Sequence, residues 1–367
     1  MSSSTSIPRD LPSLIAKQYD SALSSGSAFF YPSDVHSIKD QEGEDGPSMQ
    51  WTVRRCEALR EKAKEKKRKE EAKSGRDEPA TQKGGQNPSD VFAPPYDKDL
   101  LIAELGDHTL LLNKFALIPH HFLLVTRDFQ PQTMPPSPDT LRLAFEILSS
   151  VSRSLSTEIL CFYNCGPVSG ASQAHCHLQF VNLESGGGVL VEQLLGRIQK
   201  DGKEMETVHA LPLPYQHFVH LLPPGLSSRS ADDITSCLSD ALMKLLDAMF
   251  SAQAAAISHD DGASAQPAPA RRGARSWNLL LTGKAMHLIP RDKEDFPLGE
   301  EGPQNEEVGH LSLNALCFAG HLVTKSNEEV ERIKSHPGGV RNILSQVGRR
   351  PVSDFTVATP NSDAREG

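Results

Sequence analysis

The chain has 367 residues, of which 38% are apolar and 23% charged, and its net charge is −9. This composition is typical of a globular protein with one large or two small domains, and it argues against a general nucleic-acid binder, which would more often be basic. No stretch approaches the roughly 18 apolar residues of a membrane span, and residues 1–10 lack the apolar run of a signal peptide. We therefore expect neither nucleic acid nor membrane as a partner.

The six cysteines lie far apart along the chain and suggest no disulfide framework. Such usage favours a reducing compartment, so we expect a cytoplasmic protein, with the nucleus as a second setting.

In chain order, apolar periodicity predicts a helix over residues 11–23 and a strand over 50–54. Residues 60–76 then carry nine lysine or arginine side chains and four glutamates, a pattern typical of a solvated helix or a disordered segment. A nuclear-localisation or nucleic-acid patch is the alternative reading of this run. With the glycine- and proline-rich residues that follow, it predicts a disordered insertion over about 63–90.

Three strands are predicted next, over residues 100–105, 108–117 and 122–127, and the last two are most simply an antiparallel pair. Ser137 as N-cap and Pro138 at the first helical position begin a helix whose apolar residues recur at helical spacing. A strand over 158–164 follows. This order predicts an α+β fold, with an antiparallel sheet and a helix packed on it.

The second half of the chain repeats the mixture of strands and helices. We expect a strand over 216–220, a helix over 231–256, a hairpin of strands 277–281 and 285–289, and a final helix over 328–344. The Ala-, Gly- and Pro-rich residues 257–274 predict a disordered loop. We place an N-terminal catalytic half at 8–200, a C-terminal half at 208–346 and a flexible tail at 347–367.

Residues 163–181 hold the densest chemistry. His175, His177 and Gln179 are spaced by two, so an extended strand would present all three on one face. Cys176 and the alternate residues after it would then fill the opposite face and pack into a core. A neutral imidazole is a nucleophile near physiological pH, so a histidine here could attack phosphorus and carry a nucleotidyl group.

The residues in front of this strand form a glycine-rich loop. Gly166 and Gly170 permit turns that aim successive backbone N–H groups at one point, a concavity that binds anions. Side-chain donors are added by Ser169, Ser172 and Gln173. Zinc is the competing interpretation, with Cys161, Cys165, His175 and His177 as its ligands.

The block from Phe162 to Pro167, with Ser169-Gly170, Ser172-Gln173 and His175-x-His177-x-Gln179, resembles the signature of the diadenosine tetraphosphate phosphorylases, also called ATP adenylyltransferases. These belong to the transferase branch of the histidine-triad superfamily, beside the galactose-1-phosphate uridylyltransferases. Further blocks agree in the same order, at residues 111–126, 216–219 and 276–291. The resemblance implies antiparallel sheets with packed helices in two related halves.

The resemblance also implies the reaction. His177, which matches the second histidine of the family motif, would attack the α-phosphorus of diadenosine tetraphosphate, with His175 and Gln179 as the other catalytic residues. The adenylylated histidine would pass its group to inorganic phosphate, giving ADP and ATP, and the reverse reaction would join ATP and ADP. We expect ATP, ADP, diadenosine polyphosphates and inorganic phosphate as partners, a divalent cation such as Mg²⁺ carried by the polyphosphate without a protein metal site, and a monomer.

The residues that the resemblance places at the substrate share a capacity to contact phosphate or nucleoside. They are Lys62, Asn113, Lys114, Asn164, Gly170, Ala171, Ser172, Gln173, Gln179, Asn278, Lys284 and Arg291. Ala171, Ala174 and Met286 depart from the common pattern of the family. The alternatives left open are a histidine-triad nucleotide hydrolase, a uridylyltransferase, and a non-enzymatic module that binds zinc or nucleotide.

Overall fold

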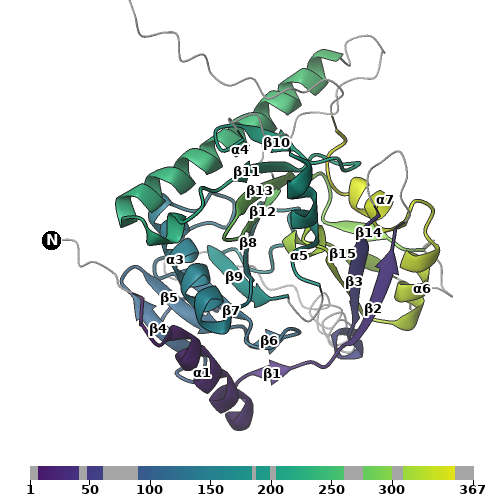
Figure 1. Ribbon diagram of the computed structural model, residues 1–367. Coiled ribbons are helices and arrows are strands. Elements are labelled where there is room, and N and C mark those ends of the chain that lie inside the picture. Colours follow the sequence, from purple (N-terminus) through teal and green to yellow (C-terminus); the bar gives the residue numbers. More distant parts are fainter. Residues whose placement is uncertain are drawn as a thin grey trace, which may run out of the picture.

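The computed structural model describes residues 7–40, 48–60, 90–183, 187–198, 204–259, 276–299 and 309–351 (Figure 1). Lys62 lies outside the described residues, as do nearly all of the predicted insertion and most of the predicted loop and tail. At the start of the predicted loop and at the start of the predicted tail, the structure contains regular contacts where disorder was expected. The helix expected to end at residue 256 continues to His259. In the predicted tail, Gly348 forms a β-bridge with Arg291, the Arg349 N–H donates to the Pro290 carbonyl, and the Arg349 carbonyl accepts from the Gln216 N–H.

Nine strands form one sheet in the order β10-β11-β13-β12-β8-β9-β7-β5-β4, and every neighbouring pair is antiparallel. Its strands are β4 (Leu101–Leu105), β5 (His108–Leu112), β7 (Phe122–Thr126), β8 (Ile159–Cys165), β9 (His177–Asn182), β10 (Val208–Ala210), β11 (Phe218–Leu221), β12 (Trp277–Leu281) and β13 (Ala285–Pro290). Since β8 pairs with β12, the two predicted halves share this sheet. The antiparallel pairing predicted for the strands that begin at residues 108 and 122 is confirmed by β5 and β7.

Helices α1 (Leu11–Ser25), α3 (Pro138–Leu155) and α4 (Ala231–His259) pack on one face of the sheet. In α3 the Ser137 hydroxyl accepts a hydrogen bond from the Thr140 N–H, which confirms the predicted N-cap. The apolar stripe of α3, from Leu141 to Val151, is buried against α1, α4 and the sheet. This face is therefore closed by hydrophobic packing.

Smaller elements cover much of the opposite face, and Figure 1 shows them on the side away from α1, α3 and α4. They include the sheet β16-β3-β2, with β2 (Asp34–Lys39), β3 (Gln50–Arg55) and β16 (His321–Thr324), and helices α5 (Ala315–Phe318), α6 (Asn327–Ser335), α7 (Gly339–Ser345) and η2 (Leu190–Arg197). Two short ladders complete the fold, β1 (Phe29–Phe30) with β6 (Phe115–Ala116) and β14 (Asp295–Pro297) with β15 (His310–Ser312), along with the turn η3 (Leu226–Ser228).

The single final helix predicted over residues 328–344 is wrong, because the chain breaks between α6 and α7. Pro337 cannot continue a helix, and Gly338 and Gly339 both take positive φ angles, of 78° and 65°. Among the helices that the structure describes, none is long and apolar enough to cross a membrane.

Candidate active site

Strand β9 carries two of the three predicted catalytic residues, His177 and Gln179, on the face away from α3 and α4. Leu178 and Phe180 point into the helix-covered core, as the alternation predicted. Residues 177 and 179 consequently project from the opposite face, where the Phe92 ring lies 5.0 Å from the His177 ring. This face holds the candidate active site.

His177 is held as a neutral imidazole. Its Nδ1–H donates to the His175 carbonyl at 2.7 Å, which leaves the Nε2 lone pair as the nucleophile. Only 2% of the residue is exposed, and burial lowers the pKa of His177 to about 4. The ring is therefore unprotonated at neutral pH and able to attack phosphorus.

His175 anchors the segment that covers His177. Its Nδ1–H donates to the Asp90 carboxylate at 2.9 Å, and its Nε2 lies 3.0 Å from the Thr126 hydroxyl. The other carboxylate oxygen of Asp90 accepts from the Phe92 N–H at 3.0 Å. With both ring nitrogens engaged, His175 positions Phe92 over the nucleophile and is not itself available to attack.

Gln179 belongs to a chain of three side chains. Asn113 Nδ2 lies 2.9 Å from His121 Nδ1, and His121 Nε2 lies 3.1 Å from Gln179 Oε1. Burial lowers the pKa of His121 to about 4, so the ring carries one proton. With Asn113 donating to Nδ1, that proton is on Nε2 and is donated to the Gln179 oxygen. The Gln179 amide nitrogen is then the end that can meet a phosphate.

The glycine-rich loop presents unused amides in front of β9. Gly166 and Gly170 take φ angles of 91° and 81°. A side chain at Gly170 would also meet the Leu313 carbonyl oxygen at 2.8 Å, so only glycine fits there. Within the described residues, no hydrogen bond engages the backbone N–H groups of residues 170–174, which leaves Ala171, Ser172 and Gln173 free to offer amides to an anion. Ser169 is different, because its hydroxyl donates to the Gly166 carbonyl inside the loop.

Asn164, Asn278 and Arg291 form a buried network behind this loop. Asn164 Oδ1 accepts from Asn278 Nδ2 at 2.8 Å and from the Ala315 N–H at 2.9 Å. Arg291 is 1% exposed and donates to Asn278 Oδ1 at 2.7 Å. Its Nη2 donates to the backbone carbonyls of Lys293 and Glu294, and burial lowers the pKa of Arg291 to about 10. Arg291 and Asn278 therefore support the loop from behind. Arg291 is buried and is not exposed to a phosphate as the resemblance implied.

The two described lysines of the predicted site, Lys114 and Lys284, lie in different parts of the structure. Lys114 is exposed, and its ammonium group forms no ion pair with a described residue. Lys284 lies at the turn between β12 and β13. Leu281, at the end of β12, pairs with Cys161 near the start of β8, and that end of β8 pairs with the end of β9 that is far from His177. At this turn Lys284 forms ion pairs with Glu158 and Glu192, at 2.9 Å each. The structure thus does not bring Lys284 to the reactive histidine.

The zinc interpretation fails on geometry. Cys161 and Cys165 point into the helix-covered core, and His177 projects from the other face of the sheet. Burial raises the pKa of the Cys165 thiol to about 12 and that of Cys176 to about 11, which opposes the thiolates that zinc requires. Among the described residues, no group of three or more His, Cys, Asp or Glu side chains is arranged to hold a metal.

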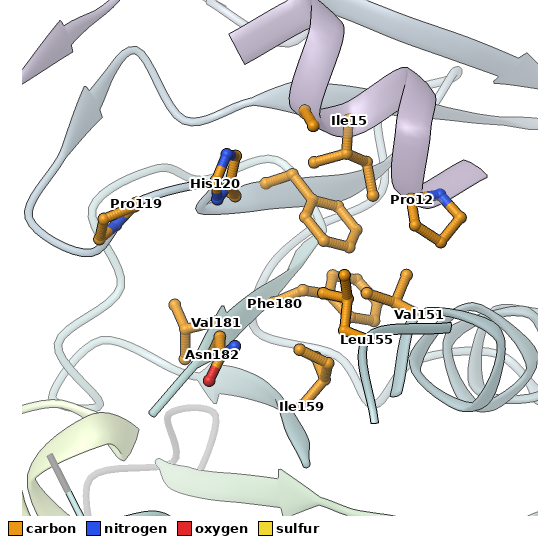
Figure 2. A pocket seen from close by; sticks show the side chains of 12 residues that line it. Pro12, Ile15, Pro119, His120, Val151, Leu155, Ile159, Phe180, Val181 and Asn182 are labelled. Atoms are coloured by element: carbon orange, nitrogen blue, oxygen red, sulfur yellow. The ribbon is translucent and has the colours of Figure 1, made fainter. Parts of the chain in front are cut away.

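A cavity of about 90 Å³ lies elsewhere, between α1, α3 and the far end of β9 (Figure 2). Ile15, Val151 and Phe180 line it with apolar surface, and His120 and Asn182 stand at its edge. It lies on the helix-covered side and holds neither the nucleophile nor the amides of the loop, so it is not the active site.

Sequence reasoning missed three residues of the site, Asp90, His121 and Gln132, the last of which accepts a hydrogen bond from the His177 N–H through its Oε1. His121 lies two residues before Leu123, which pairs with Gln179, so strand alternation could have placed it beside Gln179. Asp90 begins the proline-bearing segment that includes Phe92. Gln132 lies in a loop with no periodic pattern, and nothing in its surroundings in the sequence indicates its contacts.

Two family models match the chain, an Ap4A phosphorylase N-terminal domain over residues 1–195 and an ATP adenylyltransferase C-terminal domain over residues 211–350. Protein APA1 of Saccharomyces cerevisiae is 27% identical over 358 residues, covering 94% of this chain and 95% of that protein. Diadenosine 5',5'''-P1,P4-tetraphosphate phosphorylase 2 of the same yeast is 29% identical over 275 residues, covering 71% and 76%.

Solved structures share the fold. The crystal structure of yeast Ap4A phosphorylase Apa2 superposes with a TM-score of 0.69 and 23% identity, over 95% of this chain and all of that one. Its complex with Ap4A gives a TM-score of 0.66 over the same share of this chain. Since the N-terminal model alone spans more than half of the sequence, the chain belongs to the Ap4A phosphorylase family.

Proposed function

We propose that this Ap4A phosphorylase cleaves diadenosine tetraphosphate (Ap4A) through an adenylyl group carried on His177 Nε2. In the first step Nε2 forms a bond to the α-phosphorus, the bond from that phosphorus to the bridging oxygen breaks, and ATP leaves. In the second step an oxygen of inorganic phosphate attacks the same phosphorus, the P–N bond breaks, and ADP forms. The observation that carries this proposal is the neutral, buried His177 ring with its Nε2 unengaged.

The phosphate oxygens would meet donors on two sides of His177. The free amides of residues 170–174 approach from the loop, and the Gln179 amide nitrogen approaches from β9. Donors fixed in place where charge develops stabilise the transition state, and removing one typically costs about 2.7–4 kcal/mol. Gln179 cannot deliver a proton as a third histidine would, which suits transfer to phosphate.

The nucleoside would extend from His177 past Gln179 to Asn113 and the β1–β6 ladder. Asn113 is connected to Gln179 through His121, and Leu112 and Ala116 of the same segment pack toward α1. The Phe115 ring stacks on Phe29 at 5.9 Å, and these residues are 41% and 43% exposed. Exposed aromatic rings of this kind bind a nucleobase by stacking.

The entry side of the phosphate chain would be neutralised by Lys114 and by a divalent cation such as Mg²⁺ that travels with the polyphosphate. We further propose that the protein acts as a monomer in the cytoplasm. In this scheme the carboxamide network and the loop amides bind and orient the substrate, and the His177 ring forms the covalent bond.

Isotopic phosphate tests the reaction. The protein is incubated with Ap4A and ³²P-labelled inorganic phosphate, and the products are separated. We expect ATP and ADP in equal amounts, with the label in the β-position of ADP. Formation of AMP without incorporated label would mean that water is the acceptor and that the protein is a nucleotide hydrolase.

A further inference from the structure

Gln132 is a polar side chain buried between the two strands that flank the loop, and none of the chemistry above requires it. It follows β7 in a stretch without regular structure, and only 3% of it is exposed. A buried carboxamide is costly unless each polar atom finds a partner. The partners of Gln132 therefore indicate what its burial achieves.

The ladder between β8 and β9 stops short of the nucleophile. Its register runs from Ile159 opposite Asn182 to Phe162 opposite Gln179. Continued at the same register, it would place Asn164 opposite His177, but these two residues do not pair. The strands separate at this level, and the loop of residues 166–176 opens between them.

The Gln132 carboxamide fills the place of the missing pair. Its Oε1 accepts from the His177 N–H at 2.8 Å, and its Nε2 donates to the Asn164 carbonyl at 2.8 Å and to the His177 carbonyl at 3.3 Å. A carboxamide has the same donor and acceptor as a peptide group. The side chain consequently bridges the separated strands as an additional peptide unit would.

The backbone of Gln132 holds both ends of the loop as well. Its N–H donates to the Ala174 carbonyl at 2.8 Å, and its carbonyl accepts from the Gly166 N–H at 3.2 Å. The same carbonyl accepts from the Tyr163 hydroxyl at 3.2 Å. One residue thus connects the end of β8, the two ends of the loop and the nucleophile.

We infer that Gln132 is a positioning residue, which sets the distance between His177 and the phosphate-binding amides of residues 170–174. The inference rests on the proposed function, since it concerns the attack of His177 on a bound phosphate. Without the bridge, β8 and β9 would close or shift while the loop kept its own amides. Nucleotide binding would then survive better than attack, because a misplacement of about 1 Å can cost about a hundredfold in rate.

The first test removes the hydrogen bonds and keeps the volume, with Gln132→Met. Single-turnover mixing with labelled Ap4A gives the rate at which the label becomes attached to protein, and equilibrium dialysis with AMP gives nucleotide affinity. We expect the rate of adenylylation to fall by about tenfold to a hundredfold, with AMP affinity changed less than about threefold. Gln253→Met is the matched control, because Gln253 is a similarly buried glutamine on α4, 6% exposed, whose amide atoms have no hydrogen-bond partner among the described residues. It should leave both quantities unchanged.

The second test uses Gln132→Glu, which separates positioning from a general loss of packing. A protonated carboxyl group has one donor and one acceptor, enough to bridge the His177 N–H and the Asn164 carbonyl. Burial against two carbonyl oxygens disfavours the carboxylate and raises its pKa above the usual value of about 4.3. The adenylylation rate of this variant should approach wild type at low pH and fall as the pH rises. Hydrogen bonds connect Gln132 to the titratable residues Tyr163 and His177 and, through them, to Cys176, His175 and Asp90. The contributions of these groups are shared by the wild type, which is measured in parallel.

The outcomes separate the two proposals. If the wild-type protein forms no adenylylated histidine, the proposed function is wrong. If the wild type is adenylylated and Gln132→Met reacts equally fast, the inference about Gln132 is overturned and the proposed function stands. The inference is also overturned if Gln132→Met loses AMP affinity in the same proportion as rate, or if Gln132→Glu shows the pH profile of the wild type.

Discussion

Gln179 Oε1 lies 3.1 Å from His121 Nε2, and this contact orients the carboxamide that we propose meets a phosphate. His121 in turn accepts a hydrogen bond from Asn113, so the orientation is fixed by residues that lie in or directly beside the neighbouring strands β9, β7 and β5. A glutamine without this partner could turn its oxygen toward a phosphate and repel it. In the proposed reaction, Asn113 and His121 would therefore act on the transition state through Gln179, without contacting the substrate phosphate themselves.

Replacing His121 tests this connection. We expect His121→Leu to lower the rate of Ap4A phosphorolysis by about tenfold to a hundredfold, the effect of weakening one electrostatic donor. His120→Asn is the matched control, since His120 is the exposed neighbour and its positive φ of 57° suits asparagine. Steady-state kinetics measure the rate of Ap4A phosphorolysis by both variants. Equal rates for His121→Leu and the control would contradict the role given to His121.

The stacked pair of Phe29 and Phe115 predicts where the nucleobase lies. Phe115→Ala should raise the dissociation constant for AMP by about fivefold or more, since base stacking on an aromatic side chain contributes about 1–3 kcal/mol. Calorimetric titration with AMP measures this change. Phe250→Ala, on α4, removes a similarly exposed ring at a remote site and should not alter binding. An unchanged affinity in Phe115→Ala would place the base elsewhere.

Two of the three lysines predicted at the substrate, Lys114 and Lys284, should behave differently. Lys114→Met should weaken binding of Ap4A, because Lys114 is exposed, follows Asn113 in the chain and has no ion-pair partner in the described part of the chain. Lys284→Met should leave KM and kcat unchanged and lower the free energy of unfolding by about 1–3 kcal/mol, because Lys284 is exposed but its partner Glu192 has a side chain that is only 7% exposed and would lose its counter-ion. A large rise in KM for Lys284→Met would show that the substrate reaches the far end of the sheet.

Buried neutral histidines predict a loss of stability in acid. Burial lowers the pKa of His121 and His177 to about 4 and that of His287 to about 3, below the ordinary value of 6.5. Between those values and 6.5 the unfolded chain binds more protons than the folded one. The free energy of unfolding therefore falls as the pH falls through this window, by up to about 1.36 kcal/mol per pH unit for each histidine, and is regained above it.

Urea denaturation at several pH values between 7 and 5 measures this slope. His287→Leu removes one of the buried rings outside the active site, so its unfolding free energy should depend less on pH than that of the wild type. Identical slopes for the two proteins would mean that the His287 ring is not kept neutral by burial.

The sequence predicted the strand that carries the site because the information is local. Alternation alone placed His177 and Gln179 on one face and Leu178 and Phe180 in the core. The contacts of Gln132, His121 and Asp90 join positions 45, 58 and 85 residues apart, and no periodic pattern records them. Lys284 and Arg291 were both assigned to the substrate, but β13 separates them, and its register puts Lys284 at the wrong end and buries Arg291 behind the loop.

The central claim is that the reaction passes through a covalent bond to one imidazole nitrogen. The direct measurement is to mix the protein with Ap4A labelled in the α-phosphate, without inorganic phosphate, denature it within the first turnover and map the label by mass spectrometry. The account predicts an acid-labile AMP group on His177, which disappears on addition of phosphate and is absent in His177→Ala. Turnover of Ap4A by the wild type without any such adduct, or an active His177→Ala variant, would contradict it.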